Sequence, residues 1–159
     1  MPLFLYGDDD YRSGQKLKEI KEDFKLKVDP SGVNITTFDG ADFDLEKFNN
    51  ASAQQGFLAA KRLVIVKNLL AAKLDKDRSE KLAEIIKSLN DSDNSYVFWE
   101  SGSPDKRTAL FRLLAKDKKM VMEFKPLEYG PLVDWLKKYL ASRQGRMSAS
   151  AQELLLSFQ

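Results

Sequence analysis

Short apolar runs alternate along the chain with longer segments in which apolar residues recur every three or four positions. The longer segments predict helices, because residues at such spacings share one helical face. The short runs predict strands, and their alternation with helices predicts an α/β fold with a mostly parallel, five-stranded sheet in three layers. The predicted strands are Leu3 to Tyr6, Val33 to Phe38, Leu63 to Val66, Tyr96 to Trp99 and Met120 to Phe124.

Capping patterns locate the predicted helix starts. A carboxylate of Asp8 to Asp10 can accept hydrogen bonds from the free N–H groups of the first helix. Ser79 is a predicted N-cap, and the Ser–Pro pair at 103–104 suits a cap followed by proline in the first helical position. Later predicted starts are Pro131 and a capping box of Ser150 with Glu153. The polar segment 90–95 is expected to be a loop.

The last apolar stripe, at Leu154, Leu155 and Phe158, has almost nothing after it. The stripe therefore predicts that a second domain begins in this part of the chain. No internal repeat or low-complexity segment is found.

The stretch before the third predicted strand combines a helix breaker with two large apolar residues. Gly56 ends the preceding helical pattern, and Phe57 and Leu58 follow where a connection is expected to be polar. Two interpretations remain open at this stage. Either these side chains fold back into the core, or they are held out for a partner.

Composition narrows the possible chemistry. The 159 residues include no cysteine and no histidine, which removes disulfides, thiolate nucleophiles and the usual imidazole base. No apolar run approaches the roughly 20 residues needed to cross a bilayer. The N-terminus lacks a basic leader, so we expect a cytoplasmic protein without a membrane partner.

Charge is distributed unevenly. Residues 1–60 carry seven Lys and Arg against eleven Asp and Glu, whereas residues 61–159 carry nineteen against thirteen. A basic second half can lie near nucleic acid, and Lys106, Arg107, Lys118 and Lys119 are candidates for a DNA-facing surface. The same charges also suit an ordinary solvated surface.

In a parallel sheet covered by helices, ligands commonly bind at the carboxyl ends of the strands. The loop after the first predicted strand is therefore the candidate position for a phosphate site. A P-loop reads G-x-x-x-x-G-K-[ST], and the loop that begins at Gly7 does not have this spacing. Three carboxylates, at Asp8 to Asp10, stand where a polyanion would sit and would repel it. Helix capping is a better explanation for them than metal binding. Asp39, Asp42 and Asp44 are typical of turns and helix N-caps rather than of a catalytic site. We expect no catalytic site, cofactor or metal.

Four motifs together resemble a known family. They are the loop Tyr6 to Tyr11, the triplet Phe38 to Gly40, the stretch from Gln55 to Asn68 and the stretch from Glu100 to Thr108. In this order and spacing they are similar to the N-terminal part of the delta subunit of bacterial DNA polymerase III, over essentially all of the chain.

The resemblance implies an AAA+-like α/β domain over residues 1–140 that has lost its functional P-loop. The truncated start of a helical lid domain would follow over residues 141–159. It also implies a non-catalytic clamp-loader subunit, part of a DNA polymerase holoenzyme, that binds the sliding clamp and helps open the ring. Phe57 and Leu58 match the apolar pair that makes this contact, with Gln54 or Gln55 as the preceding Gln. Other loader subunits and primer–template DNA are further implied partners. The alternative is a degenerate nucleotide-binding protein such as a small kinase or ATPase.

Overall fold

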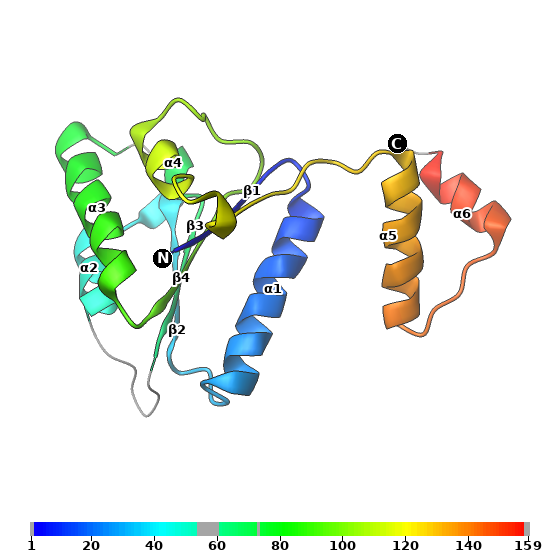
Figure 1. Ribbon diagram of the computed structural model, residues 1–159, viewed down its shortest axis with the longest axis horizontal. Coiled ribbons are helices and arrows are strands. Elements are labelled where there is room, and N and C mark those ends of the chain that lie inside the picture. The colour runs from blue at the N-terminus through cyan, green and yellow to red at the C-terminus, as the bar shows by residue number, and fades with distance from the viewer. Residues whose placement is uncertain (1, 54–60, 73, 158–159) are drawn as a thin grey trace. The chain divides into compact units, whose positions relative to one another are not determined.

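A computed structural model describes residues 2–53, 61–72 and 74–157 of the chain (Figure 1). The chain divides into two compact units, Met1–Lys125 and Pro126–Gln159. The strands are β1 (Leu3–Tyr6), β2 (Ile35–Asp39), β3 (Leu63–Lys67), β4 (Ser95–Trp99) and β5 (Val121–Glu123). The helices are α1 (Asp10–Lys27), α2 (Leu45–Ala53), α3 (Lys76–Ser88), α4 (Ala109–Leu114), α5 (Tyr129–Ser142) and α6 (Ala149–Leu156).

The five strands form one sheet in the order β2-β3-β4-β1-β5, and every neighbouring pair is parallel. The predicted α/β class with a parallel five-stranded sheet is therefore confirmed. In Figure 1, α1 covers one face of the sheet, while α2, α3 and α4 cover the other. Because all strands run the same way, the chain enters every strand at one edge of the sheet, the amino edge, and leaves at the opposite carboxyl edge.

The strands are apolar on both faces because both faces are covered by helices. In β3, Val64 and Val66 pack toward α2, α3 and α4, and Leu63 and Ile65 pack toward α1. All four side chains are at most 1% exposed. This double burial explains why the strand reads as an unbroken apolar run rather than as an alternation of apolar and polar residues.

Aromatic rings fill the layer on the side of α2, α3 and α4. Phe48 from α2 lies edge-on to Phe38 of β2 and Phe98 of β4, with ring centroids 5.6 and 6.4 Å apart. Phe111 from α4 meets Phe4 and Tyr6 of β1 edge-on, at 5.5 and 5.2 Å. Edge-to-face contacts at these separations are favourable, so they fix how α2 and α4 sit on the sheet.

Several helices begin elsewhere than their capping patterns predict. Asp75, not Ser79, caps α3, because its carboxylate accepts the N–H of Arg78 at 2.8 Å. Thr108 caps α4, since the chain after Ser103 first forms a turn that Asp105 organises.

The second unit differs from prediction in the same way. Ser148, rather than Ser150, caps α6, and α5 begins at Tyr129, two residues before Pro131. Trp135 and Tyr139 stack along α5 with centroids 5.1 Å apart. The predicted domain boundary at residue 140 falls inside α5 and stays a prediction, whereas the compact units separate after Lys125.

Among the described residues, no helix is both long and apolar enough to span a bilayer.

A buried carboxyl group ties two loops together at the carboxyl edge. Glu100, directly after β4, is 2% exposed, and its Oε1 accepts the N–H of Leu70 at 2.9 Å. Burial raises the pKa of Glu100 to about 7, although the hydrogen bonds from the backbone of Leu70 and Leu69 act in the opposite direction. The carboxyl group therefore prefers to be protonated in the folded protein well above its ordinary range.

A close backbone approach fixes the neighbouring turn. Gly40 begins the short 3₁₀ helix η1 (Gly40–Asp42), which lies against η2 (Leu69–Ala71). A Cβ on Gly40 would lie 2.0 Å from the carbonyl oxygen of Asn68. Only glycine allows the two backbones to approach this closely without a shift.

We predict that Glu100→Gln flattens the pH dependence of stability. Well below pH 4.5 the carboxyl group is protonated in both the folded and the unfolded state. As pH rises through 4.5 toward 7, the unfolded state loses the proton first, so the free energy of unfolding falls. The shift corresponds to about 3 kcal/mol at most. Chemical denaturation between pH 4.5 and 7.5 measures the slope of the free energy of unfolding against pH. Glu84→Gln, at an exposed position of α3, is the control; an unchanged slope in Glu100→Gln would contradict the assignment.

We also predict that Gly40→Ala lowers the free energy of unfolding by about 2 kcal/mol, because the added methyl group meets backbone atoms that cannot rotate away. Gly14→Ala is a matched control inside α1, where a Cβ meets nothing within 4 Å. Helix propensity alone should make that variant more stable by about 0.5–1 kcal/mol. Urea denaturation measures both variants, and equal stabilities would disprove the close approach.

Candidate functional site at the edges of the sheet

The loop after β1 is closed by its own backbone. Gly7 N–H donates to the carbonyl oxygen of Gly102 at 2.9 Å, and the two glycines form an isolated antiparallel bridge. Gly7 has a φ of +134°, and a Cβ there would lie 2.2 Å from the carbonyl oxygen of Phe124. The loop thus lies directly between the ends of β4 and β5, at the point where ligands commonly bind in an open α/β sheet.

Two of the three predicted capping carboxylates accept hydrogen bonds from the protein itself. Asp9 is the N-cap of α1, accepting the N–H of Arg12 at 2.8 Å and its guanidinium at 3.1 Å. Asp10 accepts the hydroxyl of Ser101 at 2.8 Å and the N–H of Gly102 at 3.0 Å. Helix capping is therefore confirmed for Asp9. Asp10 instead joins the start of α1 to the loop after β4.

A phosphate site needs free backbone N–H groups at a helix N-terminus. In this loop the N–H groups of Gly7, Asp9 and Gly102 already donate to protein oxygens. Across residues 2–53, 61–72 and 74–157, no cluster of three or more His, Cys, Asp or Glu side chains could hold a metal ion. The geometry of the carboxyl edge favours a structural role for this loop over nucleotide binding.

Lys106 and Arg107, two of the candidate DNA-facing residues, form ion pairs at the carboxyl edge. Lys106 Nζ lies 2.8 Å from Glu123 Oε1 and 5.3 Å from the centre of the Tyr6 ring. The hydrogen bond from Lys106 lowers the pKa of Glu123, and burial raises that of Tyr6. Arg107 forms a forked pair with Asp105, with both N–O distances 3.0 Å, and this pairing lowers the pKa of Asp105 to about 2.

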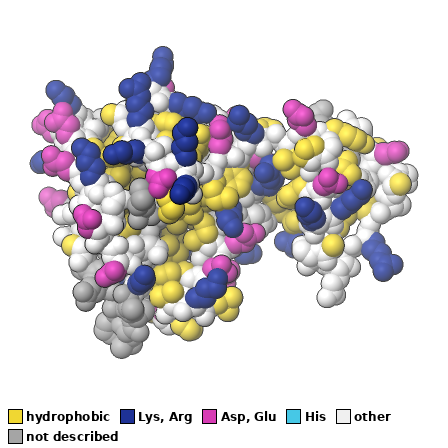
Figure 2. All heavy atoms as spheres, viewed as in Figure 1, with side chains coloured by type: hydrophobic (Ala, Val, Ile, Leu, Met, Phe, Trp, Pro, Cys, Tyr) yellow, Lys and Arg dark blue, Asp and Glu magenta, His cyan; other side chains and the backbone are white. Residues whose placement is uncertain are grey.

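Lys118 and Lys119 lie elsewhere. They belong to the 3₁₀ helix η4 (Lys118–Met120), which precedes β5, whereas Lys106 pairs with Glu123, the last residue of β5. The four residues are thus divided between the two ends of that strand. Figure 2 shows Lys and Arg side chains gathered over the region where Figure 1 places α4. Contact of these side chains with DNA stays a prediction.

The predicted partner-binding residues Gln54, Gln55, Phe57 and Leu58 lie outside the described residues. The flanks of this segment are described, and both are at the amino edge: α2 ends at Ala53 and β3 begins at Leu63. We call residues 54–60 the edge segment.

Backbone and side-chain hydrogen bonds fix both flanks of the edge segment. Arg62 N–H donates to Asn94 Oδ1 at 2.9 Å, and the carbonyl oxygen of Arg62 accepts Ser95 N–H at 2.8 Å. On the other flank, the carbonyl oxygen of Ser52 accepts the hydroxyl of Tyr96 at 3.2 Å and the side-chain amide of Asn94 at 3.4 Å. The two flanks are therefore both attached to the start of β4.

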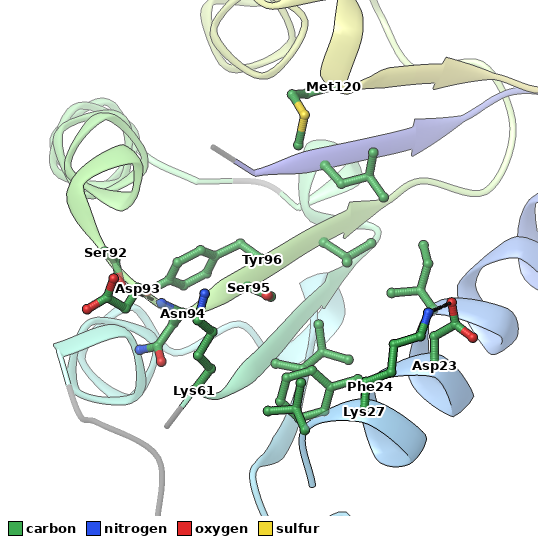
Figure 3. A pocket seen from close by; sticks show the side chains of 15 residues that line it. Asp23, Phe24, Lys27, Lys61, Ser92, Asp93, Asn94, Ser95, Tyr96 and Met120 are labelled. Atoms are coloured by element: carbon green, nitrogen blue, oxygen red, sulfur yellow. Dashed lines mark hydrogen bonds and ion pairs between the residues drawn. The ribbon is translucent and has the colours of Figure 1, made fainter. Parts of the chain in front are cut away.

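A hollow of about 510 Å³ opens beside these residues (Figure 3). Lys61, Asn94 and Tyr96 stand on one side of it, and Phe24 and Lys27 of α1 stand on the other. Its remaining lining residues are Leu3, Ile20, Asp23, Val28, Leu63, Ser92, Asp93, Ser95, Val97 and Met120.

Sequence reasoning missed Asn94 and Tyr96 as members of this edge. Asn94 falls in the segment 90–95, for which the sequence predicts a polar loop, and Tyr96 is predicted only as part of a strand. No local signal marks either residue, because their partners Ser52 and Arg62 are more than 30 residues away along the chain.

Solved structures of two other proteins have a similar fold. The "Bacillus subtilis DNA clamp loader delta protein" is 22% identical with a TM-score of 0.66, and the alignment covers 97% of this chain and 47% of that one. DnaA from Aquifex aeolicus, bound to AMPPCP, is 14% identical with a TM-score of 0.63, covering 98% and 50%. The chain thus spans about half the length of each. Both likenesses show an AAA+-like fold.

Comparison with curated protein sequences gives no match. A sequence model of one family does match, and it covers residues 3–124, from the start of β1 to the residue after β5. The matched range is more than half of the chain and includes the whole sheet. The chain therefore belongs to the family described as DNA polymerase III, delta subunit.

Proposed function

We propose that this chain acts as the clamp-loader subunit that binds the sliding clamp and helps to open the ring. Family membership supports the assignment to a clamp loader. The observation that carries the proposal further is the attachment of both flanks of the edge segment to the sheet. An apolar pair between two fixed flanks is suited to entering a pocket of another protein.

Phe57 and Leu58 are the proposed anchors, with Gln54 or Gln55 making a polar contact beside them. Large apolar side chains that fill a pocket carry much of the binding energy of an interface. β3, which follows the edge segment, is buried on both faces and paired on both sides, so a partner held there is connected to a stiff element.

The proposal places the protein in the cytoplasm, where it would meet the other loader subunits and, within the complete loader, primer–template DNA. The carboxyl edge supports a role without catalysis, because its loop is closed by hydrogen bonds of Gly7 and Asp10 to Gly102. The chain would then contribute binding, while any hydrolysis of nucleotide would belong to other subunits.

The first test removes the anchors. Phe57→Ala combined with Leu58→Ala should weaken binding to the sliding clamp about a thousandfold, because each truncation typically costs about 2 kcal/mol in a filled pocket. Surface plasmon resonance with immobilised clamp measures this loss. The control is Tyr11→Ala, which removes an exposed aromatic ring near the carboxyl edge and should bind as tightly as the wild type. Unchanged binding by the double variant would refute the proposal.

The second test addresses the kinase or ATPase alternative. Calorimetric titration with ATP and magnesium should give no saturable heat, since the N–H groups of Gly7, Asp9 and Gly102 have protein acceptors and Asp8 to Asp10 add negative charge. Titration of ATP into buffer gives the heat of dilution as a control. Saturable binding at micromolar nucleotide would instead favour the alternative.

A further inference from the structure

We infer that Asn94 is the positioning residue for the edge segment, and that it sets the geometry with which the segment meets a protein partner. This inference rests on the proposed function. It concerns a residue of the loop before β4, outside the edge segment and outside every motif that indicated the family.

Asn94 joins the two flanks through one rigid group. Its Nδ2 donates to the carbonyl oxygen of Ser52, and its Oδ1 accepts the N–H of Arg62. The orientation of the amide is unambiguous, because a carbonyl oxygen can only accept and a backbone N–H can only donate. Since Nδ2 and Oδ1 belong to the same planar group, they fix the relative positions of two backbone atoms that are ten residues apart.

A closed ring of hydrogen bonds holds Asn94 in turn. Its own N–H donates to Ser92 Oγ at 3.2 Å, and Ser92 Oγ lies 2.9 Å from the hydroxyl of Tyr96. The Tyr96 hydroxyl must donate to the carbonyl oxygen of Ser52, so it accepts from Ser92. The ring thus returns to the carbonyl oxygen that Asn94 itself binds, and each hydroxyl in it both donates and accepts.

The buried ring of Tyr96 gives this arrangement a firm support. Tyr96 is 3% exposed and belongs to β4, the strand between β3 and β1. The other flank is anchored again through Arg62, whose guanidinium donates to Thr36 Oγ1 in β2 at 3.3 Å. Three adjacent strands therefore share in holding the flanks, and the side chain of Asn94 bonds to both flanks.

Preorganisation is the physical consequence. A segment whose ends are fixed loses less conformational freedom on binding than one whose ends move independently. Removing the link between Ser52 and Arg62 should therefore weaken partner binding without removing any atom of the contact surface.

The main variant is Asn94→Asp, which keeps the acceptor for Arg62 N–H but replaces the donor to the Ser52 carbonyl with an oxygen. We expect the dissociation constant for the sliding clamp to rise about five- to tenfold. Tyr96→Phe, which removes the hydroxyl and its hydrogen bonds to Ser52 and Ser92, should cause a smaller rise in the same direction. The matched control is Asn90→Ala, which removes a side-chain bond to the carbonyl oxygen of Lys87, away from both flanks.

Coupling separates positioning from a general loss of stability. The effect of Asn94→Asp on affinity should shrink in a Leu58→Ala background, because both changes act through the edge segment. Urea denaturation of each variant reports folding independently.

If Asn94→Asp and Tyr96→Phe bind the clamp like wild type while the Phe57 and Leu58 double variant does not, Asn94 has no positioning role and the proposed function stands. An effect of equal size in both backgrounds overturns the inference too. If the double variant also binds normally, the proposed function fails and the inference with it.

Discussion

The parallel pairing of β3 with β4 is the constraint on which the rest of the first unit depends. It places Leu63 opposite Ser95 and continues one step beyond the strands, where the carbonyl oxygen of Arg62 accepts Ser95 N–H. This register brings Asn94 within reach of both flanks of the edge segment. A slip by one residue would exchange the side chains that β3 presents to its two helical layers and would break the same contacts.

The two edges of the sheet have different roles because their loops use polar groups differently. At the carboxyl edge, carboxylates and N–H groups bind one another, so that Asp10, Ser101 and Gly102 form a closed local network. At the amino edge, side chains bind backbone atoms of a neighbouring connection. The first arrangement uses the N–H groups of Gly7, Asp9 and Gly102 within the fold, and the second fixes a connection in place.

Periodicity predicted the strands, their parallel direction and the cover on both faces, since these follow from which residues must be buried. Helix starts were less predictable, because several residues could cap each helix and the choice depended on local turns. Ser79 and Asp75, for example, both suit an N-cap, but only Asp75 caps α3.

Of the candidate site, the sequence indicated a family and an apolar pair, and it marked the carboxylates of the β1 loop. It did not indicate Asn94 or the ion pair of Lys106 with Glu123, because each partner comes from a distant part of the chain. Contacts of this kind follow from the sheet order, which a single sequence does not display.

The position of Arg62 has a mechanical consequence. Arg62 leads directly into β3, which is paired along its whole length with β2 on one side and β4 on the other. A load applied at this residue along the strand axis acts on both ladders in shear, so their hydrogen bonds resist together instead of opening one after another. The central part of the sheet can therefore carry tension from its amino edge into the body of the protein with little extension.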